Sequence, residues 1–418
     1  MGCGTSWTHG AAGRSRRPRR RRVLPPQPQP RRGLRGDVVA EPLLEVKGLS
    51  VDYEVGAGTF HALSEVSLEL PAGHVVGIVG ETGCGKSTLA HAIPRLLREP
   101  PARIRSGEVR FRGMDLLTLP KWKLPLVRGT GISMVFQEPI NSLNPAFRVF
   151  DQLAEAVRIR KMRESGQAPG LVPGSEGFDY SKREGPKPAD ALTRPLLPSR
   201  PEARKGFSRV LHRVDFREDA LDYLRLVRIN DPETILDLYP HELSGGMRQR
   251  IMIAMALSEK PSLLIADEPT SALDITIQAQ VLTLMKELIE EIRTSILFIS
   301  HDLGVIAEMA DDVGVMYAGH LVEFGPVDDV YEHPRHPYTK ALLRSAPNQY
   351  KDDGPLPSLP GSVPNLSRLP SGCSFHPRCP LAKPVCSDDP GPVLEVQKGT
   401  AAGHEAACYF SEEVAGLP

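Results

Sequence analysis

A glycine-rich segment with a lysine and hydroxyl side chains offers the clearest chemistry in this chain. It follows the apolar run 75–79. Its glycines let the backbone turn tightly and direct N–H groups at phosphate oxygens, while Lys86 can reach β- and γ-phosphates and Ser87 can bind Mg²⁺. A helix that begins here adds its positive N-terminal end. The segment predicts a phosphate-binding loop (P-loop) for a nucleoside triphosphate, formed by Gly80, Glu81, Thr82, Gly83, Cys84, Gly85, Lys86, Ser87 and Thr88.

Two adjacent carboxylates end a second apolar run, Leu263–Ala266. Asp267 at the tip of a strand can hold Mg²⁺ through water, and Glu268 can orient or deprotonate an attacking water. A plain helix N-cap is the simpler alternative, because Pro269 and Thr270 follow. With a P-loop upstream, the pair favours phosphate hydrolysis.

A second anion site is predicted where Ser244, Gly245 and Gly246 begin a helix. A serine hydroxyl and unpaired backbone N–H groups attract anions at such a position. An ordinary N-cap is again the alternative, but the segment lies between the P-loop and Asp267-Glu268.

The composition allows more than one domain, since 418 residues can bury a large core. No window has the 18 or more unbroken apolar residues of a membrane span, so a protein acting at a membrane would sit against another subunit. The net charge is zero, yet residues 1–36 hold ten Arg and no Asp or Glu. We expect a disordered Arg/Pro-rich leader over residues 1–41, with contact to nucleic acid or anionic lipid as the alternative.

The elements that must position these motifs follow from apolar patterning. Val75–Val79, Leu263–Ala266 and Ile296–Ile299 are predicted core strands, each followed by a polar turn, as in a doubly wound α/β fold. Residues 42–70 and 107–113 alternate in period two and predict an antiparallel sheet beside the core. Residues 161–207 hold seven prolines and predict a partly disordered surface insertion.

With these motifs in order, the chain resembles an ATP-binding-cassette (ABC) ATPase, in which Leu-Ser-Gly-Gly is the signature motif. The resemblance covers about residues 43–345. Five further elements of the family are matched in this chain. They are the glutamine loop with Gln137, the D-loop ending at Asp274, the switch histidine His301, an adenine-stacking aromatic at Tyr53, and the turn Gly319–Gly325. Phe60 is the alternative aromatic, and either could be a plain core residue.

The resemblance implies a P-loop NTPase core with an antiparallel β-subdomain and a helical subdomain at about 141–250, all within an ABC ATPase domain over 42–336. It implies ATP and Mg²⁺ as cofactors. The resemblance implies catalytic roles for Glu268, His301 and Gln137. It implies that Ser87, Gln137 and Asp267 bind Mg²⁺. Two cassettes close head to tail in this family, so Ser244–Gly246 would face ATP held by a partner.

The flanking segments resemble the ATPase subunits of dipeptide and oligopeptide importers. The matching segments are Asn141–Pro145, Tyr239–Ser244, His336–Leu343 and the Cys-bearing tail. Such importers pair two different ATPases with two membrane permeases and an extracytoplasmic binding protein, which implies a peripheral position at the cytoplasmic face of the cell membrane. Nickel, glutathione or opines are alternative cargoes. An ABC ATPase acting on nucleic acid or ribosomes is the alternative of another class, although one compact cassette without heptads disfavours it.

The tail from 337 to 418 is predicted to be a small separate lobe that holds a metal. Clustered thiols in a cytosolic protein argue for a metal rather than disulfides. Zinc sites usually show close Cys pairs, which are missing here, and the wide spacing suits a [4Fe–4S] cluster better without matching a ferredoxin. The resemblance supports the cluster, because members with this tail are thought to carry one, while zinc and free thiols stay open. The expected ligands are Cys373, Cys379, Cys386 and Cys408, with His376 and His404 as possible substitutes.

Two departures have local consequences. Pro94 falls within the helix expected after the P-loop, where it should kink the helix or remove a hydrogen bond. Cys84 would place a thiol beside the phosphates, which predicts sensitivity to alkylation.

The catalytic role of Glu268 gives a first prediction. Glu268→Gln keeps the shape of the side chain but removes its ability to take a proton, so ATP binding should persist while turnover is nearly abolished. Nucleotide binding and phosphate release, measured on the same preparation, check this. Full turnover by the variant would remove Glu268 from the catalytic role.

Overall fold

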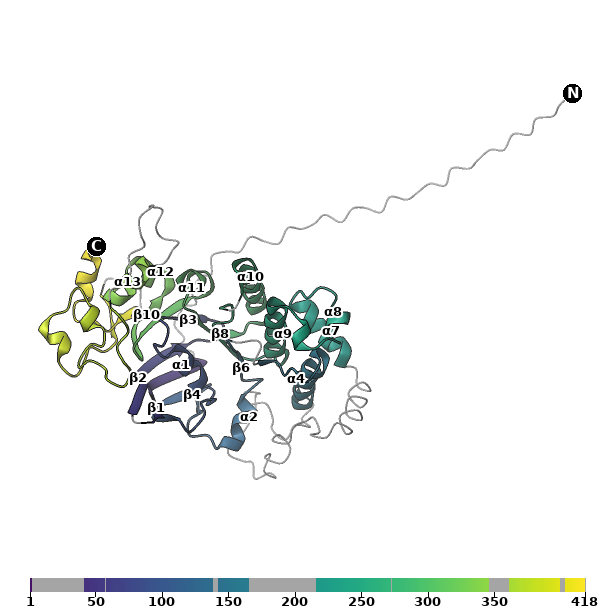
Figure 1. Cartoon of the computed structure of the whole chain (residues 1–418), viewed down its shortest axis with the longest axis horizontal. Coiled ribbons are helices and arrows are strands. Elements are labelled where there is room, and N and C mark those ends of the chain that lie inside the picture. Colours follow the sequence, from purple (N-terminus) through teal and green to yellow (C-terminus); the bar gives the residue numbers. More distant parts are fainter. Residues whose placement is uncertain are drawn as a thin grey trace. The chain divides into compact units, whose positions relative to one another are not determined.

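Two β-sheets organise the described part of the chain (Figure 1). The computed structural model describes Met1 and residues 41–56, 58–137, 142–164, 216–271, 273–345, 361–398 and 403–417. The chain divides into residues 1–40 and one unit of residues 41–418, and the sheets and helices belong to the second. Nearly all of the predicted leader and insertion therefore lie outside the described residues. The start of the predicted insertion, 161–164, belongs to helix α4 instead.

Five parallel strands form the centre of the larger sheet, whose order is β11-β12-β10-β9-β3-β8-β7-β6. β3 (Val75–Val79), β7 (Leu263–Asp267) and β8 (Ser295–Ile299) are buried along their whole length, which confirms the three predicted core strands. Continuous apolar runs suit such strands because both faces are covered. The remaining strands are β6 (Ile132–Val135), β9 (Asp312–Tyr317), β10 (His320–Pro326), β11 (Glu395–Val396) and β12 (Glu405–Ala406).

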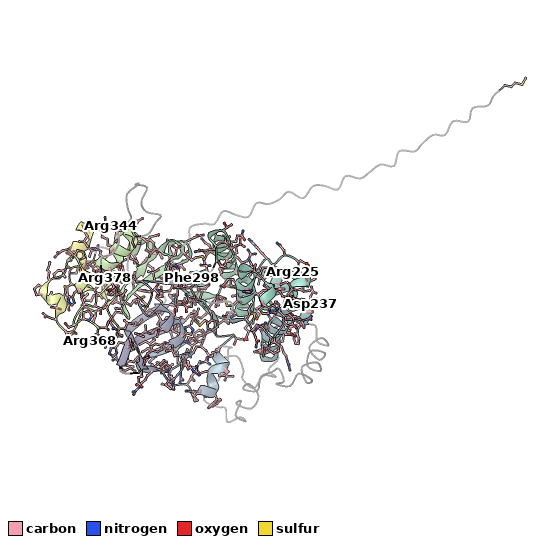
Figure 2. All side chains as sticks on the ribbon, in the orientation of Figure 1. Arg225, Asp237, Phe298, Arg344, Arg368 and Arg378 are labelled. Carbon is pink, nitrogen blue, oxygen red and sulfur yellow. The ribbon has the colours of Figure 1, made fainter. Side chains whose placement is uncertain are left out.

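The two faces of this sheet enter two different cores. On one face Val76 and Ile78 pack with helix α1 and the smaller sheet. On the other, Val75 and Val79 share a core with Phe298, whose ring is fully buried (Figure 2). This second core includes side chains of helices α4 (Val149–Glu164), α7 (Phe216–Leu226), α9 (Gly245–Ser258), α10 (Ile275–Ile292), α11 (Leu303–Met309), α12 (Val327–Glu332) and α13 (Pro337–Arg344), with short α8 (Pro232–Ile235) beside α7.

The smaller sheet is antiparallel in the order β2-β1-β4-β5, which confirms the expectation for residues 42–70 and 107–113. Its strands are β1 (Leu44–Val55), β2 (Gly58–Leu70), β4 (Ala102–Phe111) and β5 (Met114–Asp115). Helix α1 (Lys86–Ala92) lies between the two sheets. It ends before Pro94 rather than kinking there, because proline cannot donate the backbone bond that would extend the helix. A 3₁₀ turn, η1 (Lys121–Lys123), and helix α2 (Leu124–Val127) lead into β6.

The C-terminal part does not form a separate lobe, contrary to the expectation. Strand β12 pairs with β10 and β11 pairs with β12, so the tail extends the edge of the core sheet. A buried carboxylate fastens it: Glu323 accepts from the N–H groups of Arg335 and His336, at 2.6 and 2.9 Å, and lies 2.8 Å from His404 Nε2. A buried charge is tolerated when it is hydrogen-bonded in this way. The helical elements here are α12 (Val327–Glu332), α13 (Pro337–Arg344), η4 (His376–Arg378), η5 (Pro384–Ser387) and η6 (Ser411–Gly416).

Among the described residues, every helix is too short or too polar to cross a membrane.

Candidate nucleotide site and cysteine cavity

The predicted P-loop connects β3 to α1 and lies under two neighbouring strands. A Cβ at Gly80 would come within 2.2 Å of the Met316 carbonyl oxygen, and one at Gly85 within 2.5 Å of the Ala62 carbonyl oxygen. Gly85 also has φ near +106°, which L-residues with side chains avoid. Glycine is therefore required at both positions, and the loop's N–H groups can approach a phosphate closely.

Lys86 and Ser87 begin α1 at the mouth of this loop. The Lys86 ammonium is buried and donates to the carbonyl oxygens of Gly80 and Glu81, at 2.8 and 3.1 Å. The Ser87 hydroxyl donates to Asp267 Oδ1 at 3.1 Å. Burial raises the pKa of the Asp267 carboxyl, and the bond from Ser87 opposes that rise. Two of the three predicted Mg²⁺ ligands thus meet as oxygen donors, which is the ligand type that Mg²⁺ prefers.

The three predicted catalytic residues are in contact, because Gln137 and His301 both lie next to the same carboxylate oxygen of Glu268. Gln137 Nε2 donates to Glu268 Oε2 at 3.0 Å, and His301 Nδ1 lies 3.3 Å from the same oxygen. Glu268 follows β7 with φ at +45°, an uncommon value for a residue with a side chain. Strained backbone of this kind persists where the surroundings fix it, and it is frequent at active sites. Residues 138–141, which include the end of the predicted glutamine loop, lie outside the described residues.

A groove of about 480 Å³ is lined by Gln137 and Glu268, but not by His301 or Asp267. Tyr53 and Phe60, the two candidates for stacking on adenine, are partners across β1 and β2, and both line it. The two residues that the sequence offered for stacking on adenine therefore lie side by side on the same wall of the groove. The full lining is Tyr53, Val55, Phe60, Ala62, Thr82, Gly83, Gly85, Lys86, Ser87, Thr88, Gln137, Glu268 and Leu366.

Leu366 in this groove was not predicted. Its carbonyl oxygen accepts from the His61 N–H at 3.1 Å, which places Leu366 beside Phe60, one of the two candidates for stacking on adenine. No local pattern marks it, since it lies in a Pro-rich stretch more than two hundred and fifty residues after the P-loop.

Several predicted nucleotide-binding residues lie elsewhere. Ser244 caps α9 by accepting from the Met247 N–H at 3.3 Å, and Asp274 caps α10 by accepting from the Ile277 N–H at 3.0 Å. Neither residue lines the groove, nor do Gly245 and Gly246. Ser244 therefore has the N-cap role that the sequence offered as an alternative, and Asp274 has the same role at α10.

Two P-loop side chains also point away from the groove. Glu81 is bound by Arg378, which donates to both carboxylate oxygens at 2.9 and 3.2 Å. Cys84 is 1% exposed, and burial raises the pKa of its thiol. Because the thiolate is the reactive form, the structure argues against the predicted sensitivity to alkylation.

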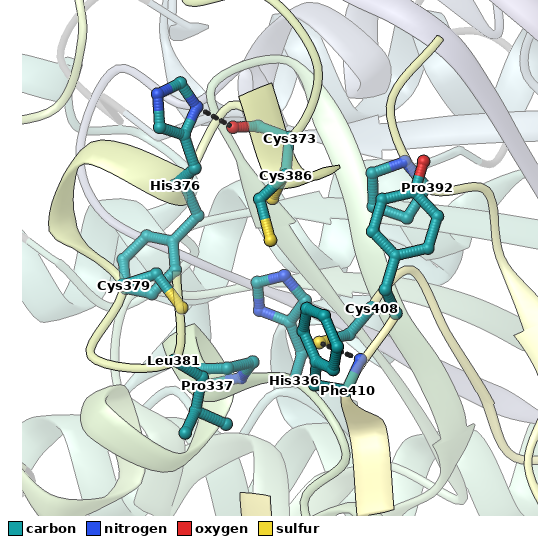
Figure 3. A pocket seen from close by; sticks show the side chains of 12 residues that line it. His336, Pro337, Cys373, His376, Cys379, Leu381, Cys386, Pro392, Cys408 and Phe410 are labelled. Carbon is teal, nitrogen blue, oxygen red and sulfur yellow. Dashed lines mark hydrogen bonds between the residues drawn. The ribbon is translucent and has the colours of Figure 1, made fainter. Parts of the chain in front are cut away.

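The four tail cysteines line a single cavity (Figure 3). All four are free thiols, and burial raises the pKa of Cys379 to about 11 and that of Cys408 to about 12. His376 lines the cavity with its Nδ1 3.0 Å from the Cys373 carbonyl oxygen. The suggested substitute His404 does not, since it is paired with Glu323. The cavity is lined by His336, Pro337, Cys373, Phe375, His376, Cys379, Leu381, Cys386, Pro392, Cys408, Tyr409 and Phe410.

Leu366 gives a second prediction. Leu366→Ala should weaken ATP binding roughly fivefold, which is about 1 kcal/mol, because it removes an apolar wall at the base end of the groove. Val396→Ala is the matched control, since Val396 is an exposed apolar residue of the same tail. Dissociation constants from titration calorimetry check it, and equal constants for both variants would contradict a contact between Leu366 and the base.

Comparison with known proteins identifies the family. Residues 63–271 match the ABC transporter family, and residues 322–386 match the oligopeptide/dipeptide transporter C-terminal region. A probable peptide ABC transporter ATP-binding protein of Sinorhizobium fredii is 43% identical, over 90% of this chain and 98% of its own length. The oligopeptide transport ATP-binding protein OppD of Salmonella typhimurium is 41% identical, over 88% of this chain and 94% of its own. With the P-loop, the paired carboxylates and the groove in place, this chain belongs to the ABC transporter family as an ATP-hydrolysing subunit.

Proposed function

We propose that this chain drives an importer of short peptides by hydrolysing ATP. Hydrolysis is supported by the Glu268 carboxylate, which lies between Gln137 and His301 and lines the same groove as the P-loop. The peptide cargo is supported by the family match of the C-terminal region and by the names of the relatives.

The proposed binding roles follow from the types of side chain. The P-loop N–H groups and the Lys86 ammonium hold the phosphates, and Tyr53 stacks on adenine. Ser87, Gln137 and Asp267 hold Mg²⁺, which when bound neutralises charge on the phosphate oxygens. Lys86 must exchange its bonds to Gly80 and Glu81 for bonds to phosphate, which costs little because one charge-assisted bond replaces another.

The proposed hydrolytic step centres on Glu268. Its carboxylate takes a proton from a water whose oxygen attacks the γ-phosphorus, while the bond from that phosphorus to the bridging oxygen breaks and ADP leaves. Gln137 and His301 hold the carboxylate at the groove. His301, with a side chain 57% exposed, is accessible to contact the γ-phosphate.

We further propose that two ABC ATPase subunits work together, in a heterodimer. Ser244 and Gly245 are exposed at the start of α9, where a partner's ATP could reach them. Two transmembrane permeases and an extracytoplasmic binding protein would complete the importer, with this chain peripheral at the cytoplasmic face of the membrane. The Arg-rich leader, the feature that favoured nucleic acid, lies outside the described residues.

For the cysteine cavity we propose a [4Fe–4S] cluster bound by Cys373, Cys379, Cys386 and Cys408. Among the described residues, no three or more His, Cys, Asp or Glu side chains are arranged to hold a metal ion. Four thiols line one cavity, and four cysteine thiolates are the ligands that would hold such a cluster.

The third prediction tests this cluster. Protein purified without oxygen should be brown, with about four irons and four acid-labile sulfides per chain. Cys408→Ser should lower the iron content, and Cys84→Ser, which changes the P-loop cysteine outside the cavity, should not. A colourless protein loaded with zinc would overturn the proposal.

The fourth prediction tests the cargo. A strain that lacks this chain should lose uptake of labelled di- and tripeptides, and the wild-type chain should restore it while Glu268→Gln should not. Nickel uptake is measured in parallel. If peptide uptake persists while nickel entry falls, the chain would still be the ATPase of an importer, but the proposed peptide cargo would be wrong and nickel would replace it.

A further inference from the structure

Residues of the C-terminal part of the chain bind the P-loop at Glu81 through hydrogen bonds and an ion pair. The Glu81 N–H donates to the Tyr338 hydroxyl of α13 at 2.9 Å. Its carboxylate accepts two bonds from Arg378, at 2.9 Å from Nη1 and 3.2 Å from Nη2. The paired, fork-shaped contact fixes both the distance and the orientation of the carboxylate.

Arg378 is itself held firmly. Its side chain is only 6% exposed, and it donates to the Tyr317 hydroxyl at 3.3 Å with its guanidinium 5.7 Å from the centre of that ring. Tyr317 packs against Tyr338 and Phe375, with ring centres 4.6 and 5.2 Å away. The cation is thus built into a buried aromatic cluster, where side chains have little freedom to move. Figure 2 marks Arg378 within the C-terminal region.

Glu81 is also tied to the phosphate-binding lysine. Its carbonyl oxygen accepts from Lys86 Nζ at 3.1 Å, while the neighbouring Gly80 carbonyl accepts from the same nitrogen at 2.8 Å. The N–H, the carbonyl and the carboxylate of one P-loop residue therefore each have a defined partner. Since the loop binds phosphate through its backbone, fixing Glu81 fixes part of the anion site.

Arg378 neutralises the negative charge of Glu81, which would otherwise disfavour ATP binding. A carboxylate in the loop that receives a polyanionic triphosphate repels the ligand, and the repulsion is strong where water is partly excluded. A cation bound to both oxygens cancels most of that repulsion at its source.

We propose that Arg378 is a positioning residue for ATP binding, which neutralises Glu81 and holds the P-loop in its phosphate-binding shape. Arg378 does not line the groove, so it acts through Glu81. The inference does not depend on the cargo or on the content of the cysteine cavity.

The test compares full-length variants at this pair. Arg378→Gln should raise the dissociation constant for ATP about tenfold, with kcat at saturating ATP within about twofold of wild type, because one charge-assisted contact is lost. Arg378→Lys keeps the charge without the fork and should fall between. Arg368→Gln is the matched control, since Arg368 is an exposed arginine of the same region and should bind ATP as wild type does.

A rescue separates positioning from general stability. In the double variant with Glu81→Gln and Arg378→Gln no carboxylate is left unpaired, so ATP affinity should return to within about threefold of wild type. Glu81→Gln alone completes the cycle, and thermal melting of every variant reports folding. A purely structural role for Arg378 would lower the melting temperature without any rescue of affinity.

Two results would overturn the proposal. One is a folded Arg378→Gln variant that binds ATP as tightly as wild type. The other is a double variant that binds as weakly as Arg378→Gln, because the loss would then not act through Glu81. Should Arg378→Gln fail to fold, Arg378→Lys and the double variant decide: wild-type affinity in the lysine variant would reject the proposal.

Discussion

The P-loop backbone passes so close to two neighbouring strands that no side chain fits between them. On one side Gly80 meets the carbonyl of Met316 in β9, and on the other Gly85 meets the carbonyl of Ala62 in β2. The loop therefore packs directly against strands of both sheets. The antiparallel sheet, which carries Tyr53 and Phe60, is for this reason part of the nucleotide site and more than a covering layer.

The same geometry explains why residues far apart in sequence meet at one edge. β3 and β7 both pair with β8 in parallel, and Ile78 and Asp267 lie opposite the same residue, Ile299. The three strands therefore end at the same level, where the P-loop leaves β3, Glu268 leaves β7 and the segment with His301 leaves β8. Parallel sheets place their ligands at this edge because every strand delivers its next turn there. Register alone thus brings the carboxylate to the histidine and to the groove.

The parts of the site that were predictable are those carried by short, continuous motifs beside an apolar strand. The P-loop, Asp267-Glu268 and His301 are of this kind, and the three core strands were placed from the same runs. Arg378 was not predictable, because 297 residues separate it from Glu81 and no local pattern records the contact. The spacing grouped the four cysteines correctly but did not identify the histidine beside them. His404 is paired with Glu323, whereas His336, the N-cap of α13, lines the cavity.

Two charged contacts of different kinds help to fix the described part of the C-terminal region to the ATPase core. Glu323 is fully buried and satisfied by backbone N–H groups and His404, which secures the tail to β10. Arg378 and Glu81 form a pair that holds the P-loop, and the carboxylate side of this pair is partly exposed. Buried ion pairs add little net stability, because desolvation offsets attraction, so such a pair is better explained by the geometry it imposes. Arg378 directly precedes Cys379, which lines the cysteine cavity. The cavity and the ATP site are therefore joined by one peptide bond and one ion pair.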